Sequence, residues 1–183
     1  MFRTLAVKLG LLVVVLVASP AALSSQPTSD GESNISNARW VNYKNEYSAS
    51  HLCKASEITL WTCEGKNKTY SLCSSIDIEE KSGYIQYRVG DQKQTTFEYP
   101  TTNLHPKGIF EYATSSNGDA WIAFQNGDYK YELVDPMRST SFIEVLKKPN
   151  DKKIAWISCG NPNQTLQLNY TIKLMQSAGI AKP

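Results

Sequence analysis

Two histidines and a few acidic clusters are the residues that offer acid–base chemistry in this chain of 183 residues. His105 precedes Pro106 in a predicted loop, and His51 stands just before Cys53. A hydrolytic triad needs a histidine that is held by a carboxylate beside a presented serine. The chain has no G-x-S-x-G elbow, and neither histidine lies in a recognisable catalytic motif. We therefore predict no catalytic residue and a protein that is not an enzyme.

Metal and carboxylate chemistry has no clearer sequence signal. The patterns H-x-H and H-E-x-x-H do not occur, so we expect no metal ion and no other cofactor. Asp77, Glu79 and Glu80 form an acidic cluster, and a glycosidase would need two carboxylates that face each other across a cleft. Sequence spacing does not provide that arrangement, so we interpret the cluster as a solvated loop between two strands.

The segment Ser82–Gly90 reads SGYIQYRVG and holds the most informative pattern for binding. Alternation puts Ile85, Tyr87 and Val89 on a core face and leaves a second face made of Tyr84, Gln86 and Arg88. The second face is either an ordinary solvated surface, which is the commoner case, or a recognition surface. A planar, multi-donor arginine beside tyrosine and glutamine suits carboxylate or sugar groups, so these three residues are the candidate binding face.

Four cysteines follow one another with nine, nine and 85 intervening residues. Structural zinc sites favour much shorter C-x2-4-C pairs, so an even count predicts two disulfides in an oxidising compartment. If Cys63 faces Lys68 across a hairpin turn, Cys63 and Cys73 stand at opposite ends of the hairpin. Five strand residues at about 3.3 Å each separate them, and a disulfide needs Cα atoms within about 7 Å. The pairs Cys53–Cys73 and Cys63–Cys159 follow by elimination.

The first 24 residues are predicted to be a secretory signal peptide. Arg3 and Lys8 form a positive n-region, Leu9–Val17 is apolar, and small residues follow. That apolar run is too short for a membrane span, which needs about 20 residues. Residues 25–38 are polar and are predicted to be a disordered leader. Residues 39–183 are predicted to form a single β domain in the periplasm or outside the cell.

Removal of the signal peptide would make the chain neutral. The segment contains two basic residues and no acidic one, so 17 basic and 17 acidic residues remain. A neutral mature chain offers no electrostatic attraction to polyanions. We therefore expect no nucleic-acid partner and no membrane insertion after signal cleavage.

Period-two alternation broken by turn residues continues from residue 57 almost to the end of the chain. It predicts nine strands, over 57–63, 68–74, 83–89, 94–99, 109–114, 120–125, 128–134, 141–147 and 153–159. No long helical pattern separates them, so the fold class is all-β: an antiparallel meander that forms a barrel or a two-sheet sandwich.

Two local signals refine this outline. Asn126-Gly127 predicts a tight hairpin turn that would place Phe124 opposite Tyr129. Near the C-terminus, Leu168, Ile172 and Met175 recur at near-helical spacing before Gly179 and predict a short helix.

Several motifs together resemble a family of small exported bacterial β-proteins: Trp61-x-Cys63, Gly65-Lys66, Ser71-Leu72-Cys73, the run Ser82–Gly90, Phe124-x-Asn126-Gly127-x-Tyr129-x-Tyr131 and Ala178-Gly179-Ile180. The resemblance spans roughly residues 50–181. The family has no assigned activity, so the resemblance implies export from a Gram-negative cell and no catalytic residues.

A weaker resemblance is to the periplasmic inhibitors of C-type lysozyme. They share an aromatic-x-Cys hairpin, a loop similar to Ser82-Gly83-Tyr84 and a turn similar to Lys107-Gly108. The leading expectation is an exported non-enzymatic β-protein whose partner is an unknown envelope component or protein. A lysozyme inhibitor is the alternative.

Overall fold

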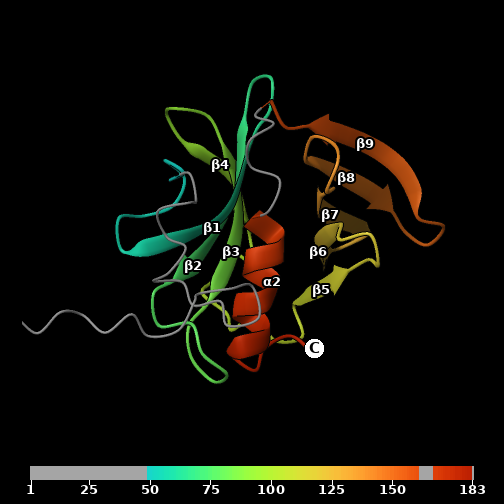
Figure 1. Cartoon of the computed structure of the whole chain (residues 1–183). Helices are drawn as coiled ribbons and strands as arrows, with labels where there is room; N and C mark the ends of the chain where they lie inside the picture. The colour runs from blue at the N-terminus through green and yellow to red at the C-terminus, as the bar shows by residue number, and fades with distance from the viewer. Residues whose placement is uncertain (1–48, 161–166, 183) are drawn as a thin grey trace, which may run out of the picture. The chain divides into compact units, whose positions relative to one another are not determined.

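The computed structural model describes residues 49–160 and 167–182, and these build nine strands and one helix (Figure 1). The elements are β1 (Glu57–Glu64), β2 (Thr69–Ser75), β3 (Ile85–Gly90), β4 (Thr95–Tyr99), β5 (Phe110–Thr114), β6 (Ala120–Asn126), β7 (Tyr129–Asp135), β8 (Phe142–Lys147), β9 (Lys152–Ser158) and α2 (Gln167–Ser177). All nine predicted strands are confirmed, and their ends differ from the prediction by two residues at most.

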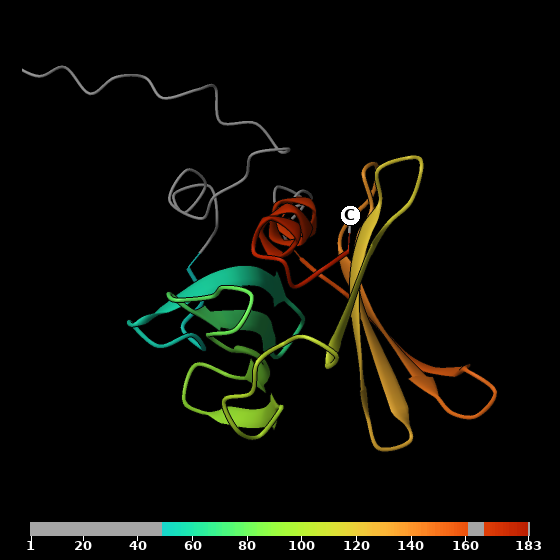
Figure 2. The same cartoon turned by 90° about the horizontal axis from the view of Figure 1, so that it is seen from below.

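The strands form two antiparallel meanders that share no strand pair. One sheet has the order β1-β2-β3-β4 and the other the order β5-β6-β7-β8-β9. The two-sheet sandwich is therefore the correct form of the predicted meander, and a closed barrel does not form. Figure 2 shows α2 lying between the two sheets along one side, where it contacts β1 of the first sheet and β5, β6 and β7 of the second.

The core lies between the inner faces of the two sheets. Its largest fully buried apolar residues come from both sheets and from α2. They are Trp61, Leu60, Leu72, Ile85 and Tyr87 of the first sheet, Ile122, Phe124, Leu133 and Ile143 of the second, and Leu168 and Ile172 of the helix. Phe124 stacks between Tyr99 of β4 and Tyr131 of β7, with ring centroids 4.7 and 4.9 Å away. Offset aromatic packing of this kind adds to the free energy of area burial.

The C-terminal helix follows the spacing that predicted it. Leu168, Ile172 and Met175 are all buried in the core. Gly179 takes a φ of 71°, and the amide of Ile180 donates to the carbonyl of Met175 at 2.9 Å. A left-handed glycine with such a bond is a common helix ending.

Both predicted hairpin registers are wrong by a small shift. Asn126 pairs with Tyr129, so the turn residues are Gly127 and Asp128, and Phe124 lies opposite Tyr131. In the first hairpin, Cys63 pairs with Tyr70 rather than Lys68, and a bulge between Thr59 and Trp61 moves the register again. At Phe124 and at Cys63 the partner differs from the predicted one by two residues, which keeps each side chain on its predicted face of the sheet.

Both predicted disulfides are present. Cys53 bonds to Cys73 and joins the segment before β1 to β2. Cys63 bonds to Cys159 and joins the end of β1 in one sheet to the residue after β9 in the other. The elimination argument holds despite the shifted register, because Cys63 still lies at the turn end of its hairpin.

Some predictions concern residues that lie outside the described ones. They are the signal peptide over 1–24, the leader over 25–38 and the start of the domain over 39–48. Within the described residues, no helix has the length and apolar character that a membrane crossing requires.

The two disulfides should contribute unequally to stability. Cys63–Cys159 joins residues 96 apart in the sequence, and Cys53–Cys73 joins residues 20 apart. Chain entropy stabilises by about 4.7 kcal/mol for a loop of about 100 residues and by about 3 kcal/mol for a short one. We expect the Cys63→Ala/Cys159→Ala variant to lose about 1.5 kcal/mol more than Cys53→Ala/Cys73→Ala, measured by urea unfolding. Equal losses would contradict the loop-length argument.

Candidate functional site

The three residues of the predicted binding face lie together, but they do not form a solvated surface. Arg88 of β3 is only 1% exposed, Gln86 is also buried, and Tyr84 is half-buried. The solvated-face interpretation is therefore wrong for Arg88 and Gln86. β3 pairs with β2 on one side and β4 on the other, so its side chains have neighbouring strands on both flanks.

Arg88 forms a buried ion pair with Glu57 at the start of β1. Nη1 of Arg88 donates to Oε2 of Glu57 at 2.6 Å, and Nη2 donates to Oε1 at 2.7 Å. Nη1 also donates to the carbonyl of Leu52 at 2.8 Å, and Nη2 to Oε1 of Gln86 at 2.6 Å. Tyr84 completes the network, because its hydroxyl donates to Oε1 of Glu57 at 2.6 Å.

The segment before β1 covers this network. Its carbonyl at Leu52 is one of the acceptors of Arg88, and the hydroxyl of Ser50 accepts a hydrogen bond from Ser71 of β2 at 2.6 Å. The Cys53–Cys73 disulfide holds the same segment against β2. The sequence carries no signal for this cover, because residues 49–56 have no alternating or helical pattern.

The electrostatics keep both members of the pair charged. Burial alone would raise the pKa of Glu57, but hydrogen bonds from Arg88, Tyr84 and the amide of Lys54 outweigh it and lower this pKa to about 2. The hydrogen bond to Glu57 raises the pKa of Tyr84 to about 12. A carboxylate with so low a pKa is a poor general base at neutral pH. A ligand carboxylate would have to displace Glu57 to reach Arg88, so recognition by this face stays a prediction.

The remaining acid–base residues are held by backbone carbonyls or face solvent. Nε2 of His51 lies 2.9 Å from the carbonyl of Asp91, and Nε2 of His105 lies 3.0 Å from that of Glu79. The side chains of Asp77, Glu79 and Glu80 are exposed, as the loop interpretation predicted. Within the described part of the chain, no group of three histidine, cysteine, aspartate or glutamate residues is placed to hold a metal ion.

A pocket of about 470 Å³ lies where β4 of the first sheet meets the second sheet. We call it the aromatic pocket. Its floor contains Tyr99, Phe110 and Phe124, and its rim carries the polar side chains of Glu111, Gln125, Lys130 and Lys148; Gly108 and Ile109 complete the lining. Sequence analysis assigned these aromatic residues to strands and did not place them at a site.

A second pocket, of about 500 Å³, lies between the β1–β2 turn and β9. We call it the Trp156 pocket. Its lining residues are Lys66, Asn67, Lys68, Tyr70, Trp156, Ile157 and Ser158. Sequence analysis also missed this site, although two lysines in one tight turn and a tryptophan on the last strand were available as signals.

Comparison of the chain with protein-family models, with curated proteins and with solved structures finds no match.

Arg88→Ala should destabilise the fold rather than leave it unchanged. The substitution leaves Glu57, whose side chain is 0% exposed, as a buried charge without its partner. Loss of one member of a buried pair costs about 3–5 kcal/mol, whereas a solvated surface change costs less than about 0.5 kcal/mol. Urea unfolding measures the difference, and a loss below about 0.5 kcal/mol would contradict the buried pair.

The pH dependence of the free energy of unfolding tests the same ion pair. Since the pKa of Glu57 is lowered to about 2 in the folded state, the pair stabilises fully above the ordinary value of 4.5, and this stability is lost as the pH falls towards 2. Glu57→Gln should flatten this part of the profile.

Proposed function

We propose that this protein is an exported, non-enzymatic binding protein of the bacterial envelope that holds a neutral saccharide in its aromatic pocket. The observation that carries the proposal is the pocket itself, because both sheets contribute to its lining. Ligand sites are commonly concave, have apolar and aromatic walls, and carry a few convergent polar groups.

The floor of the aromatic pocket is rigid. Phe124 is held between the rings of Tyr99 and Tyr131, whose planes make angles of only 13° and 5° with its own. Phe110 packs against Phe124 edge-to-face at 5.5 Å. Phe110 and Phe124 are themselves buried, so the half-buried ring of Tyr99, which they hold in place, is the apolar surface that can contact a sugar ring.

The rim of the pocket carries charges that are balanced within the protein. Nζ of Lys130 lies 2.8 Å from Glu132 and 4.0 Å from Glu111, and Nζ of Lys148 lies 2.9 Å from Asp151. These groups and the amide of Gln125 offer hydrogen-bond donors and acceptors. Because the lysines are already paired with carboxylates, the rim has little excess charge to attract a charged ligand. Neutral hydroxyl groups suit such a rim better than an anion does.

Separate features of the chain support the two other parts of the proposal, export and a non-enzymatic role. Both disulfides fit an oxidising compartment, and the apolar run at Leu9–Val17 fits a signal peptide. Both histidines contact backbone carbonyls, and Glu57 is held as a carboxylate. These placements favour binding over turnover.

Export has a direct test in the mass of the mature protein. We expect the periplasmic fraction of a Gram-negative host to contain a chain that begins between residues 22 and 25. Alkylation without reductant should modify none of its four cysteines, because all of them are in disulfides. A full-length chain in the cytoplasm, measured by intact-mass analysis, would contradict the proposal.

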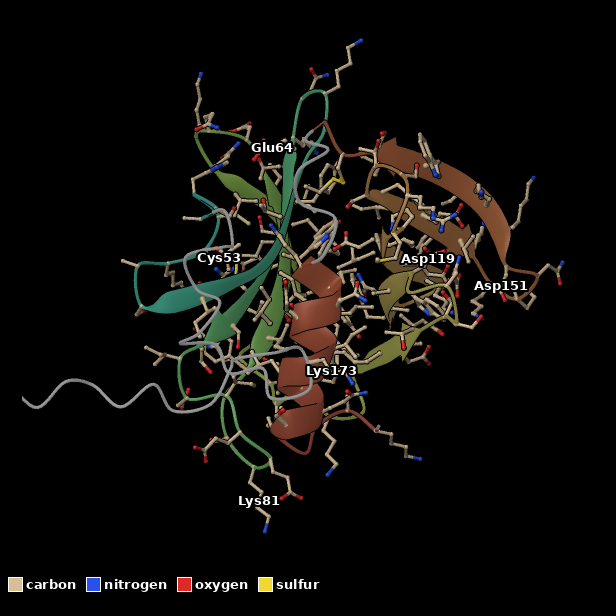
Figure 3. All side chains as sticks on the ribbon, in the orientation of Figure 1. Cys53, Glu64, Lys81, Asp119, Asp151 and Lys173 are labelled. Atoms are coloured by element: carbon tan, nitrogen blue, oxygen red, sulfur yellow. A yellow bond between two sulfur atoms is a disulfide. The ribbon has the colours of Figure 1, made fainter. Side chains whose placement is uncertain are left out.

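A lysozyme inhibitor is the second candidate, and one contact pattern favours it. The loop that precedes Ser82 contacts the turn at Lys107: Nζ of Lys107 lies 3.8 Å from Glu80, and His105 contacts the carbonyl of Glu79. Lys81 in the same loop lies at the opposite end of the first sheet from Glu64 (Figure 3). The loops therefore form one exposed surface that a protein partner can reach.

The saccharide-binding protein and the lysozyme inhibitor predict opposite responses to Tyr99→Ala and Lys107→Ala. We expect the mature domain, once immobilised, to retain solubilised envelope saccharides. Tyr99→Ala and Gln125→Ala should each weaken that retention by about tenfold, because Tyr99 belongs to the floor and Gln125 to the rim. Lys107→Ala and the exposed Tyr129→Ala are the controls, and both should bind like the wild type.

Retention that survives both pocket substitutions would contradict the saccharide proposal. Inhibition of a C-type lysozyme that Lys107→Ala abolishes and Tyr99→Ala preserves would support the second candidate instead.

A further inference from the structure

The Trp156 pocket has two walls that come from different sheets. Lys66, Asn67, Lys68 and Tyr70 belong to the first hairpin, and Trp156 belongs to β9. The Cys63–Cys159 disulfide joins these walls, and the amide of Gly160 donates to the carbonyl of Glu64 at 2.7 Å. Figure 3 shows a disulfide beside the labelled Glu64. The pocket is therefore fixed by covalent and backbone bonds.

The stability of the fold gives no reason for the exposure of Trp156. Its side chain is 54% exposed, although burial of a tryptophan is strongly favourable. The ring of Phe142 packs against it at 5.6 Å and holds the indole in place. β9 is also an edge strand of its sheet. A fixed aromatic ring at an open edge is suited to stack on a ligand.

The cationic side of the pocket is not closed by an ion pair within the described residues. Lys66 and Lys68 are exposed, and neither forms an ion pair with another described residue. Glu64 accepts a hydrogen bond from the hydroxyl of Thr69 at 2.9 Å, and Asp91 accepts one from the amide of Lys93 at 2.7 Å. The charge of Asp91 also interacts with that of Lys68, but without an ion pair both ammonium groups stay open to an anionic ligand.

We propose that the Trp156 pocket binds a saccharide that carries an anionic group, either a carboxylate or a phosphate. The sugar ring stacks on Trp156, the anionic group lies between Lys66 and Lys68, and Asn67 and Ser158 hydrogen-bond to hydroxyl groups. This site is independent of the aromatic pocket, whose rim charges are already paired.

The charge of the whole chain limits the ligand to a short one. The mature chain has as many acidic as basic residues, and binding to nucleic acid depends on many phosphate contacts. Two lysines neutralise only one or two anionic groups. A short acidic saccharide fits this pocket better than a long polyanion does.

Isothermal titration of the mature, disulfide-bonded domain tests this proposal with four probes: trigalacturonate, mannose 6-phosphate, neutral maltotriose and the peptide triglutamate. We expect at least one acidic saccharide to bind, and its affinity to fall as salt rises from about 0.05 to about 0.3 M. Binding by trigalacturonate assigns the anionic group as a carboxylate, and binding by mannose 6-phosphate assigns it as a phosphate. Maltotriose and triglutamate should bind at least about tenfold more weakly.

Matched variants locate the site. Lys66→Gln/Lys68→Gln and Trp156→Ala should each weaken binding by about tenfold or more. Lys93→Gln, an exposed lysine on another turn, and Ile154→Ala, an exposed apolar residue on the same strand, should have no effect. These five substituted side chains are exposed, so the variants should fold, and thermal melting checks this. Tyr99→Ala should also retain the binding, which separates this site from the aromatic pocket.

Three results would overturn the proposal. They are the absence of binding by either acidic saccharide up to about 10 mM, binding that survives the lysine and tryptophan substitutions, and triglutamate binding as tight as that of the acidic saccharides.

Discussion

Two sheets that share no strand pair must be held face to face by other bonds, and the buried carboxylate of Asp135 is central to that attachment. Asp135 ends β7 and accepts a hydrogen bond from Nε1 of Trp61 in the opposite sheet at 2.8 Å and from the amide of Leu168 in α2 at 2.9 Å. Burial raises the pKa of this carboxyl, and these hydrogen bonds oppose the rise. One side chain therefore connects both sheets and the helix. The Cys63–Cys159 disulfide provides a second, covalent connection between the two sheets.

Both candidate pockets depend on this arrangement. The aromatic pocket combines Tyr99 of the first sheet with Phe110 and Phe124 of the second, and the Trp156 pocket combines the first hairpin with β9. The helix covers one side of the space between the sheets (Figure 2). A sandwich that is closed by a helix, a disulfide and a carboxylate leaves concave edges where a closed barrel would not.

The sequence pattern that predicted a binding face at Tyr84, Gln86 and Arg88 corresponds in the structure to a buried ion pair between Arg88 and Glu57. A surface arginine beside tyrosine and glutamine would suit a ligand carboxylate. In this fold the carboxylate is supplied by the chain itself, with two hydrogen bonds of 2.6 and 2.7 Å. Breaking such a pair is costly, because the remaining charge stays buried. The same chemistry that suggested recognition thus holds the segment before β1 against the sheet.

The sequence by itself determined the elements whose signals are local. Alternation and turn residues located nine strands, near-helical spacing located α2, and the short hairpin between Cys63 and Cys73 excluded a bond between them. Only the tertiary structure decided the exact registers, the burial of Arg88 and the composition of the pockets. Phe124 lies opposite Tyr131 because their rings stack in the core, and Arg88 is buried because residues 49–56 fold back over β3. Lys68 and Trp156 share a pocket through a disulfide between distant parts of the chain. Such contacts form between segments far apart in sequence, where local periodicity carries no information.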